Sequence, residues 1–128
     1  MLMRFASIGS GSRGNGTLVQ AGNTLLMVDC GFALKETEQR LLRLGIEPGQ
    51  LRAVLVTHEH GDHCNGVRVL ANRYGLPVYM TAGTARARQL LDVEKVVTID
   101  SHNAFTIEDI DIQPVAVPHD AAEPVQYV

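Results

Sequence analysis

The stretch Leu51-Arg-Ala-Val-Leu-Val-Thr-His-Glu-His-Gly-Asp-His63 decides the fold of this chain. Its apolar run from Ala53 to Val56 predicts a strand that is buried on both faces, as in a parallel sheet. In open α/β sheets, such strands carry functional residues at their carboxyl ends. We therefore expect an α/β fold in which the polar residues after Val56 form the functional edge of the sheet.

Four residues after this strand are of metal-binding type: His58, His60, Asp62 and His63. On extended backbone, His58 and His60 point to the same side, so their imidazoles can bind one ion. Asp62 continues that alternation, whereas His63 must face elsewhere or follow a bend. One loop can thus supply two adjacent ions, and these donors suit Zn²⁺, Mn²⁺ or Fe²⁺. A merely solvated polar loop is the alternative, which the density of donors argues against.

Length and composition predict a single domain over residues 1–128. A chain of 128 residues with 45% hydrophobic residues can bury a real core. The net charge of -3 gives no overall attraction to nucleic acid. We find no secretory signal and no apolar stretch approaching the roughly 20 residues needed to cross a membrane, so we expect a cytoplasmic protein without a membrane partner. The two cysteines, Cys30 and Cys64, do not suggest a disulfide framework.

The remaining pattern predicts strands alternating with amphipathic helices. The expected strands cover residues 2–8, 17–21, 24–28, 53–56, 77–80, 96–99, 105–107 and 110–117, and the expected helices cover 33–44, 63–74 and 81–91. The Gly9–Gly16 loop lacks the Gly-Lys-Ser/Thr ending of a P-loop, so turn chemistry is favoured over a phosphate cradle. Asp62 can cap the second helix or bind metal. His102, Arg86 and Arg88 are predicted to lie on the surface.

The His58-x-His60-x-Asp62-His63 motif resembles the signature of the metallo-β-lactamase superfamily. The stretches Ser7-Ile-Gly-Ser-Gly-Ser-Arg-Gly-Asn-Gly-Thr17 and Val117-Pro-His-Asp-Ala-Ala-Glu-Pro-Val125 resemble its YycJ/WalJ-type branch. The resemblance implies an αββα sandwich, of which this chain would be the first αβ half plus the loop of the third motif. It also implies that the chain is truncated before a bridging aspartate and a last histidine ligand.

The resemblance further assigns roles to particular residues. His119 would join His58 and His60 on the first ion, leaving a position for water. Asp62 and His63 would bind the second ion, with Asp62 also orienting the attacking hydroxide as the catalytic residue. Asp29 would brace the loop through hydrogen bonds without binding metal. Two divalent ions are implied, Zn²⁺ with Mn²⁺ as the alternative, and Ser12 and Asn15 would lie at the rim of the site.

The branch resembled implies a dinuclear phosphodiesterase or nuclease that acts as an exonuclease on DNA, and hence a nucleic acid substrate. Arg13, Arg68 and Arg73 could contact phosphates, although solvent exposure explains scattered arginines equally well. Alternatives on this scaffold are a lactone, thioester or β-lactam hydrolase, a single-iron oxidative enzyme, and a non-catalytic fragment. Without the second half, the inner sheet face would expose apolar surface, which predicts dimerisation through that face.

Overall fold

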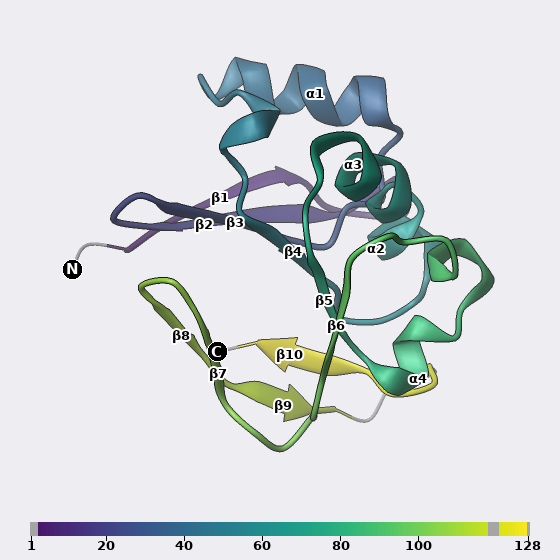
Figure 1. Cartoon of the computed structure of the whole chain (residues 1–128). Helices are drawn as coiled ribbons and strands as arrows, with labels where there is room; N and C mark the ends of the chain where they lie inside the picture. Colours follow the sequence, from purple (N-terminus) through teal and green to yellow (C-terminus); the bar gives the residue numbers. More distant parts are fainter. Residues whose placement is uncertain (1–2, 118–120, 128) are drawn as a thin grey trace.

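A mixed six-stranded sheet forms the centre of the computed structural model, which describes residues 3–117 and 121–127 (Figure 1). Its strands lie in the order β1-β2-β3-β4-β5-β6. The first three pair antiparallel, and β3 to β6 pair parallel. The strands are β1 (Met3–Gly9), β2 (Gly16–Ala21), β3 (Thr24–Val28), β4 (Ala53–Leu55), β5 (Val78–Thr81) and β6 (Val96–Ile99).

Helices cover one face of this sheet, and two small antiparallel strand pairs lie against the other (Figure 1). The helices are α1 (Leu34–Arg43), α2 (Gly61–Cys64), α3 (Val67–Tyr74) and α4 (Ala82–Ala85), with 3-10 turns η1 (Pro48–Gln50) and η2 (Arg88–Leu90). The strand pairs are β7 (Phe105–Ile107) with β8 (Ile110–Ile112), and β9 (Pro114–Ala116) with β10 (Val125–Tyr127). This confirms the predicted α/β architecture, half of a sandwich. No helix in the described residues is long and apolar enough to cross a membrane.

Strand β4 separates two hydrophobic cores and is buried along its whole length. Val54 belongs to the core on the helical side, where it packs with residues such as Leu41 and Leu70. Leu55 belongs to the opposite core, with Leu26 and the isoleucines of β7 and β8. The apolar run in the sequence therefore predicted this central strand correctly, because both of its faces are covered.

Most predicted elements are present, although several are divided or end early. The helix expected over residues 63–74 is divided into α2 and α3 at Gly66, where a Cβ atom would lie 1.9 Å from the carbonyl oxygen of Phe32. Asp62 lies in the first turn of α2, whose N-cap is His60, so its predicted capping role is wrong. The helix expected over 81–91 ends at Ala85 and is followed by η2.

Other differences concern the C-terminal strands and α1. The strand expected over 110–117 is divided into β8 and β9, and β10 was not predicted. The helix expected over 33–44 begins at Leu34 and ends at Arg43; Leu41 is buried, whereas Leu42 and the C-cap residue Leu44 are 53% and 48% exposed. The predictions that His102, Arg86 and Arg88 are exposed are confirmed.

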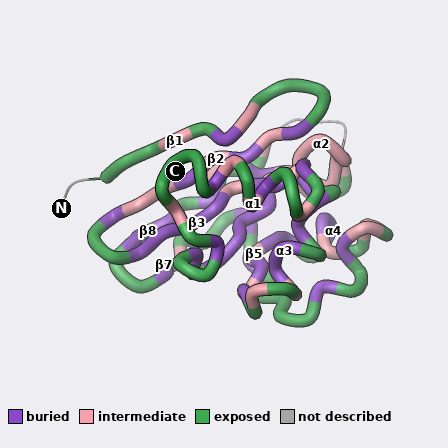
Figure 2. Tube along the Cα trace, turned by 90° about the horizontal axis from the view of Figure 1, so that it is seen from above, coloured by how far each residue is buried: buried purple, intermediate pink, exposed green. Residues whose placement is uncertain are grey.

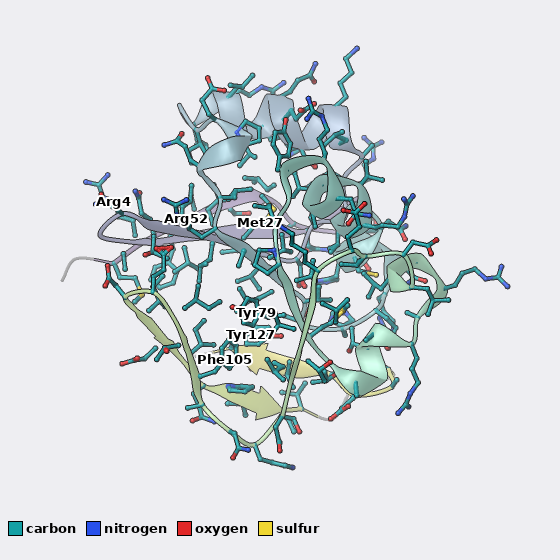
Figure 3. All side chains as sticks on the ribbon, in the orientation of Figure 1. Arg4, Met27, Arg52, Tyr79, Phe105 and Tyr127 are labelled. Carbon is teal, nitrogen blue, oxygen red and sulfur yellow. The ribbon has the colours of Figure 1, made fainter. Side chains whose placement is uncertain are left out.

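An aromatic cluster attaches the C-terminal strands to the sheet (Figure 3). The Tyr79 and Phe105 rings stack with centroids 5.4 Å apart, and Tyr127 meets Phe105 edge-on at 6.5 Å. The Tyr127 hydroxyl donates to the carbonyl oxygen of Val56 at 2.6 Å, and burial raises the pKa of this phenol above its usual range. Strand β10 is therefore fixed directly below the residues that begin the histidine-rich loop.

The hairpins cover only part of the inner sheet face. Leu26 and Leu55 are about 1% exposed, whereas Met3 and Phe5 of β1 are 46% and 67% exposed. Figure 2 shows this exposed start of β1 beside the buried sheet interior. A groove of about 340 Å³ runs between β1, β3, β8 and β10, with Met3, Phe5 and Tyr127 in its lining. Part of the apolar surface expected on this face is thus present in this groove, and dimerisation through it stays a prediction.

We expect Phe5→Glu to reduce self-association, because a carboxylate in this groove would be desolvated by a second copy. Leu91→Glu is the matched control, since Leu91 is 63% exposed and lies outside the groove. Sedimentation velocity over a range of concentrations measures the dimer fraction. A wild-type protein that stays monomeric at all concentrations would contradict the prediction.

Candidate metal centre

The centre is built at the carboxyl ends of β3 and β4, which are parallel neighbours. Asp29 follows β3, and its amide donates to the carbonyl oxygen of Leu55 at 2.8 Å. The φ angle of Asp29 is 63°, a left-handed conformation that aspartate adopts more readily than most residues. The chain therefore turns sharply at Asp29, beside the histidine-rich loop that follows β4.

The Asp29 side chain is 6% exposed and binds both ends of that loop. Its Oδ1 accepts from the Thr57 amide at 2.8 Å, and its Oδ2 accepts from the Thr57 hydroxyl at 2.6 Å. The same Oδ2 lies 2.7 Å from His63 Nδ1. Because an ionised carboxylate only accepts hydrogen bonds, His63 Nδ1 carries the proton in this contact. Asp29 thus holds the start and the end of the motif together.

The three histidine rings of the motif gather at one place. The centroids of His58 and His60 are 4.7 Å apart, and those of His58 and His63 are 4.2 Å apart. Asp62 joins them, with Oδ2 3.8 Å from His63 Nε2. The loop therefore brings together all four donor residues that the sequence singled out.

Two of these rings have a defined tautomer. The single Thr57 hydroxyl proton is donated to Asp29, so Thr57 Oγ1 accepts from His58 Nδ1, which lies 2.8 Å away. His63 also carries its proton on Nδ1, where Asp29 accepts it. In each neutral ring, the lone pair is consequently on Nε2, which is the nitrogen suited to bind an ion.

The Gly9–Gly16 loop closes one side of the centre through Asn15. Asn15 Nδ2 donates to the Asp62 carboxylate and to the Asp62 carbonyl, both at 3.1 Å. The backbone amide of Asn15 also donates to that carbonyl at 2.7 Å. Asn15 thus lies at the rim, whereas Ser12 is exposed and its role at the rim stays a prediction.

His119 lies outside the described residues, but the segment that follows it contacts the histidine-rich loop. The amide of Ala122 donates to the Glu59 carboxylate at 2.8 Å, and the amide of Val125 donates to the Thr57 carbonyl at 2.9 Å. Val117 donates to the carbonyl of Pro124 at 3.3 Å, so the two arms of this segment pair. The predicted role of His119 stays a prediction.

The donor chemistry fits a zinc-type ion, because imidazole nitrogens and a carboxylate are borderline-to-hard ligands. Within residues 3–117 and 121–127, however, no group of three or more His, Cys, Asp or Glu side chains is arranged to hold an ion. The described donors are adjacent without enclosing one position. A complete site needs at least one further ligand, and His119 is the candidate for it.

Sequence reasoning missed the residues that support the outer side of the loop. Glu59 binds Ala122, and its carbonyl accepts from Cys64 Sγ at 2.9 Å and also from the Gln89 side chain. Nothing in the motif marks Glu59, which occupies one of the two positions that the motif leaves unspecified. Burial raises the pKa of Cys64 to about 11 and also raises that of Cys30, so both buried thiols stay protonated at neutral pH.

The fold and the motif define the class of protein. The family model described as the metallo-beta-lactamase superfamily matches residues 9–124, and the chain belongs to this superfamily. Solved structures have a similar fold. A B3 metallo-beta-lactamase with an active-site glutamic acid superposes with a TM-score of 0.77 at 20% identity, over 96% of this chain and 53% of that one. The Rm3 metallo-beta-lactamase superposes with a TM-score of 0.80 at 15% identity, over 96% of this chain and 52% of that one.

Among named relatives, the chain is similar to exodeoxyribonucleases. It is 35% identical to exodeoxyribonuclease YycJ of Bacillus anthracis over 99% of this chain and 50% of the relative. It is 33% identical to exodeoxyribonuclease WalJ of Streptococcus pneumoniae over 97% of this chain and 48% of the relative. A ribonuclease Z of Methanopyrus kandleri is 29% identical over 91% of this chain and 44% of the relative. The chain thus spans about half the length of these curated relatives.

We expect Gly31→Ala to destabilise the fold by about 1–3 kcal/mol, the usual cost of overpacking. The added Cβ would lie 2.0 Å from the carbonyl oxygen of Asp62, and backbone on both sides would have to move. Gly49→Ala is the control, because nothing lies within 4 Å of its Cβ position. Urea unfolding measures the difference, and equal stability of the two variants would refute the packing argument.

In the metal-free protein, we expect His63 to make stability depend on pH. Its hydrogen bond to Asp29 raises the pKa of His63 above the ordinary value of 6.5, with support from the charges of Asp29 and Asp62 and against the effect of burial. A raised folded-state pKa means that this stabilisation is fully present below about pH 6.5 and is lost as the pH rises through the folded value.

The measurement is urea unfolding in EDTA over a series of pH values. His63→Gln should remove this fall in stability, and His102→Gln, a change at an exposed histidine, should retain it. If wild type and His63→Gln show the same pH profile, the Asp29–His63 hydrogen bond does not act as described.

Proposed function

We propose that this chain carries the histidine-rich half of a metal-dependent phosphodiesterase that degrades nucleic acid, acting as an exonuclease on DNA. The gathering of the His58, His60 and His63 rings beside Asp62 carries the proposal. The similarity to exodeoxyribonucleases at 33–35% identity supports the substrate class. We also propose that it works in the cytoplasm, a compartment in which two unpaired cysteines are ordinary.

The chain offers ligands for two ions, Zn²⁺ with Mn²⁺ as the alternative. His58, His60 and His119 would hold one ion, and Asp62 and His63 would contribute to the other. When bound, such ions supply an activated water and neutralise charge on the phosphate. The relatives are about twice as long as this chain, and we propose that the remaining ligands come from a segment corresponding to their second half.

The residues of the chain itself prepare the centre before substrate arrives. Asp29 and Thr57 fix the protons of His63 and His58 on Nδ1, so Nε2 of each ring is ready to bind. Asn15 holds the Asp62 carboxylate with a hydrogen bond of 3.1 Å. A carboxylate held in this way can accept a hydrogen bond from the attacking water and orient it toward phosphorus.

A lactone, thioester or β-lactam hydrolase is the rival function on the same scaffold. The solved metallo-beta-lactamases share the fold at 15–20% identity, which says nothing about the substrate of this chain. The named relatives are nucleases at higher identity, and this favours phosphodiester cleavage.

The test is an exonuclease assay on end-labelled DNA, with metal removed by chelation and then restored as Zn²⁺ or Mn²⁺. We run it on the 128-residue chain and on a form extended by the segment corresponding to the rest of the relatives. His58→Ala/His60→Ala should abolish cleavage and metal uptake. Asp29→Asn should weaken metal affinity by about 10–100-fold, as expected when a residue that orients a ligand is replaced.

His102→Ala is the matched control, because this exposed histidine lies outside the motif and should leave both readouts unchanged. Cleavage that survives complete chelation would overturn the metal-dependent mechanism. An extended form that binds metal and hydrolyses a lactone or β-lactam, but leaves DNA intact, would overturn the nuclease assignment.

A further inference from the structure

We propose that a hollow near the metal centre binds a backbone phosphate of the nucleic acid strand, within a few nucleotides of the bond that is cut. The hollow has a volume of about 320 Å³ and is lined by Arg13, Glu36, Gln39, Arg40 and Arg43. This proposal rests on the proposed nuclease function and names the part of the chain that holds the substrate backbone.

Two segments distant in the sequence form this hollow. Arg13 comes from the Gly9–Gly16 loop, whereas the other lining residues come from α1. The two segments are packed together through Phe32. A Cβ atom on Gly14 would lie only 2.6 Å from the Phe32 ring, so the loop backbone is in close contact with this ring. The Arg40 guanidinium stacks over the same ring at 4.1 Å and donates to the carbonyl of Ile8. The floor of the hollow is therefore held in place before any ligand binds.

The hollow has an excess of positive charge. It contains three guanidinium groups and one carboxylate, although the whole chain has a net charge of -3. Glu36 is paired with Arg40 at 2.9 Å. Arg13 and Arg43 are exposed, and neither forms an ion pair within residues 3–117 and 121–127. Two guanidinium groups thus face the hollow without a carboxylate partner, and such groups bind phosphate oxygens in pairs of hydrogen bonds.

Helix geometry alone accounts for part of this arrangement. Arg40 and Arg43 lie in the last turn of α1, where basic side chains favourably oppose the helix dipole. That argument does not account for Arg13, which comes from a loop and meets the helix only through the fold. The convergence of Arg13 with Arg43 is the feature that indicates an anion rather than a solvated helix end.

The position of Arg13 connects the hollow to the centre. Arg13 precedes Asn15 by two residues, and Asn15 is hydrogen-bonded to Asp62. Two residues of extended chain span at most about 7 Å. Successive phosphates on one strand are separated by about 3.4 Å along a duplex axis. A phosphate in the hollow would therefore lie within a few nucleotides of the scissile bond.

The other candidate arginines lie elsewhere. Arg68 and Arg73 are on α3, and Arg86 and Arg88 lie near α4 and η2; all are exposed, and none lines the hollow. Arg86 and Arg88 provide a control that removes the same charge from a different part of the surface. Arg40 is left unchanged, because it also supports the loop through Phe32 and Ile8.

The experiment compares Arg13→Gln/Arg43→Gln with Arg86→Gln/Arg88→Gln. Binding of a 5′-fluorescein-labelled single-stranded oligonucleotide to the 128-residue chain is measured by anisotropy in EDTA, over a range of salt concentrations. We expect the first variant to weaken binding equally for different sequences. The logarithm of the association constant falls as the logarithm of the salt concentration rises. The magnitude of this slope should decrease by about 0.7 for each phosphate that the variant no longer neutralises. The second variant should bind like wild type, and thermal unfolding should show that both variants are folded.

Equally weakened binding in both variants would overturn the proposal, because it would indicate only overall charge. Unchanged binding in the first variant, or no binding by wild type, would overturn it as well. Hydrolysis of bis(p-nitrophenyl) phosphate by the extended form tests the proposed phosphodiesterase activity separately from the phosphate-binding hollow. This diester has no flanking nucleotides, so Arg13→Gln/Arg43→Gln should leave its cleavage intact. If the extended form cleaves neither this diester nor DNA, the nuclease proposal fails even where the phosphate site is upheld.

Discussion

The Asp29 carboxylate is the interaction on which the rest of the centre depends. A buried carboxylate is costly unless its oxygens are hydrogen-bonded, and Asp29 meets this need only when Thr57 and His63 are both in place. The same contacts bend the loop back over the end of β4 and select the ring tautomers of His58 and His63. The loop therefore folds and its ligand rings acquire their tautomers together, because both depend on the hydrogen bonds to the buried Asp29 carboxylate.

Close backbone approach at two glycines is the second constraint. Gly31, after β3, lies against the backbone of Asp62, and Gly66, between α2 and α3, lies against the backbone of Phe32, at distances that a Cβ would forbid. Asn15 then reaches the Asp62 carbonyl with both its amide and its side chain. These two glycines therefore serve the packing of one loop on another.

The parts of the structure that depend on local pattern could be predicted from the sequence. The apolar run before Thr57 predicted β4, and the spacing of His58 and His60 predicted that these two rings would lie together. The break at Gly66 could not be predicted, because its cause is a carbonyl 34 positions away in the chain, at Phe32. For the same reason, the contact of Glu59 with Ala122 and the convergence of Arg13 with Arg43 emerge only from tertiary packing.

Two hydrogen bonds from the C-terminal segment to the residues after β4 couple the opening of β10 to the motion of the histidine loop. The amide of Val125 and the hydroxyl of Tyr127 hold the consecutive carbonyls of Thr57 and Val56, directly before the first histidine. Detachment of β10 would leave both carbonyls without these partners and free the loop above them. Hydrogen exchange in β10 and in the histidine loop should therefore be governed by a shared opening, as a single cooperative subunit of the fold.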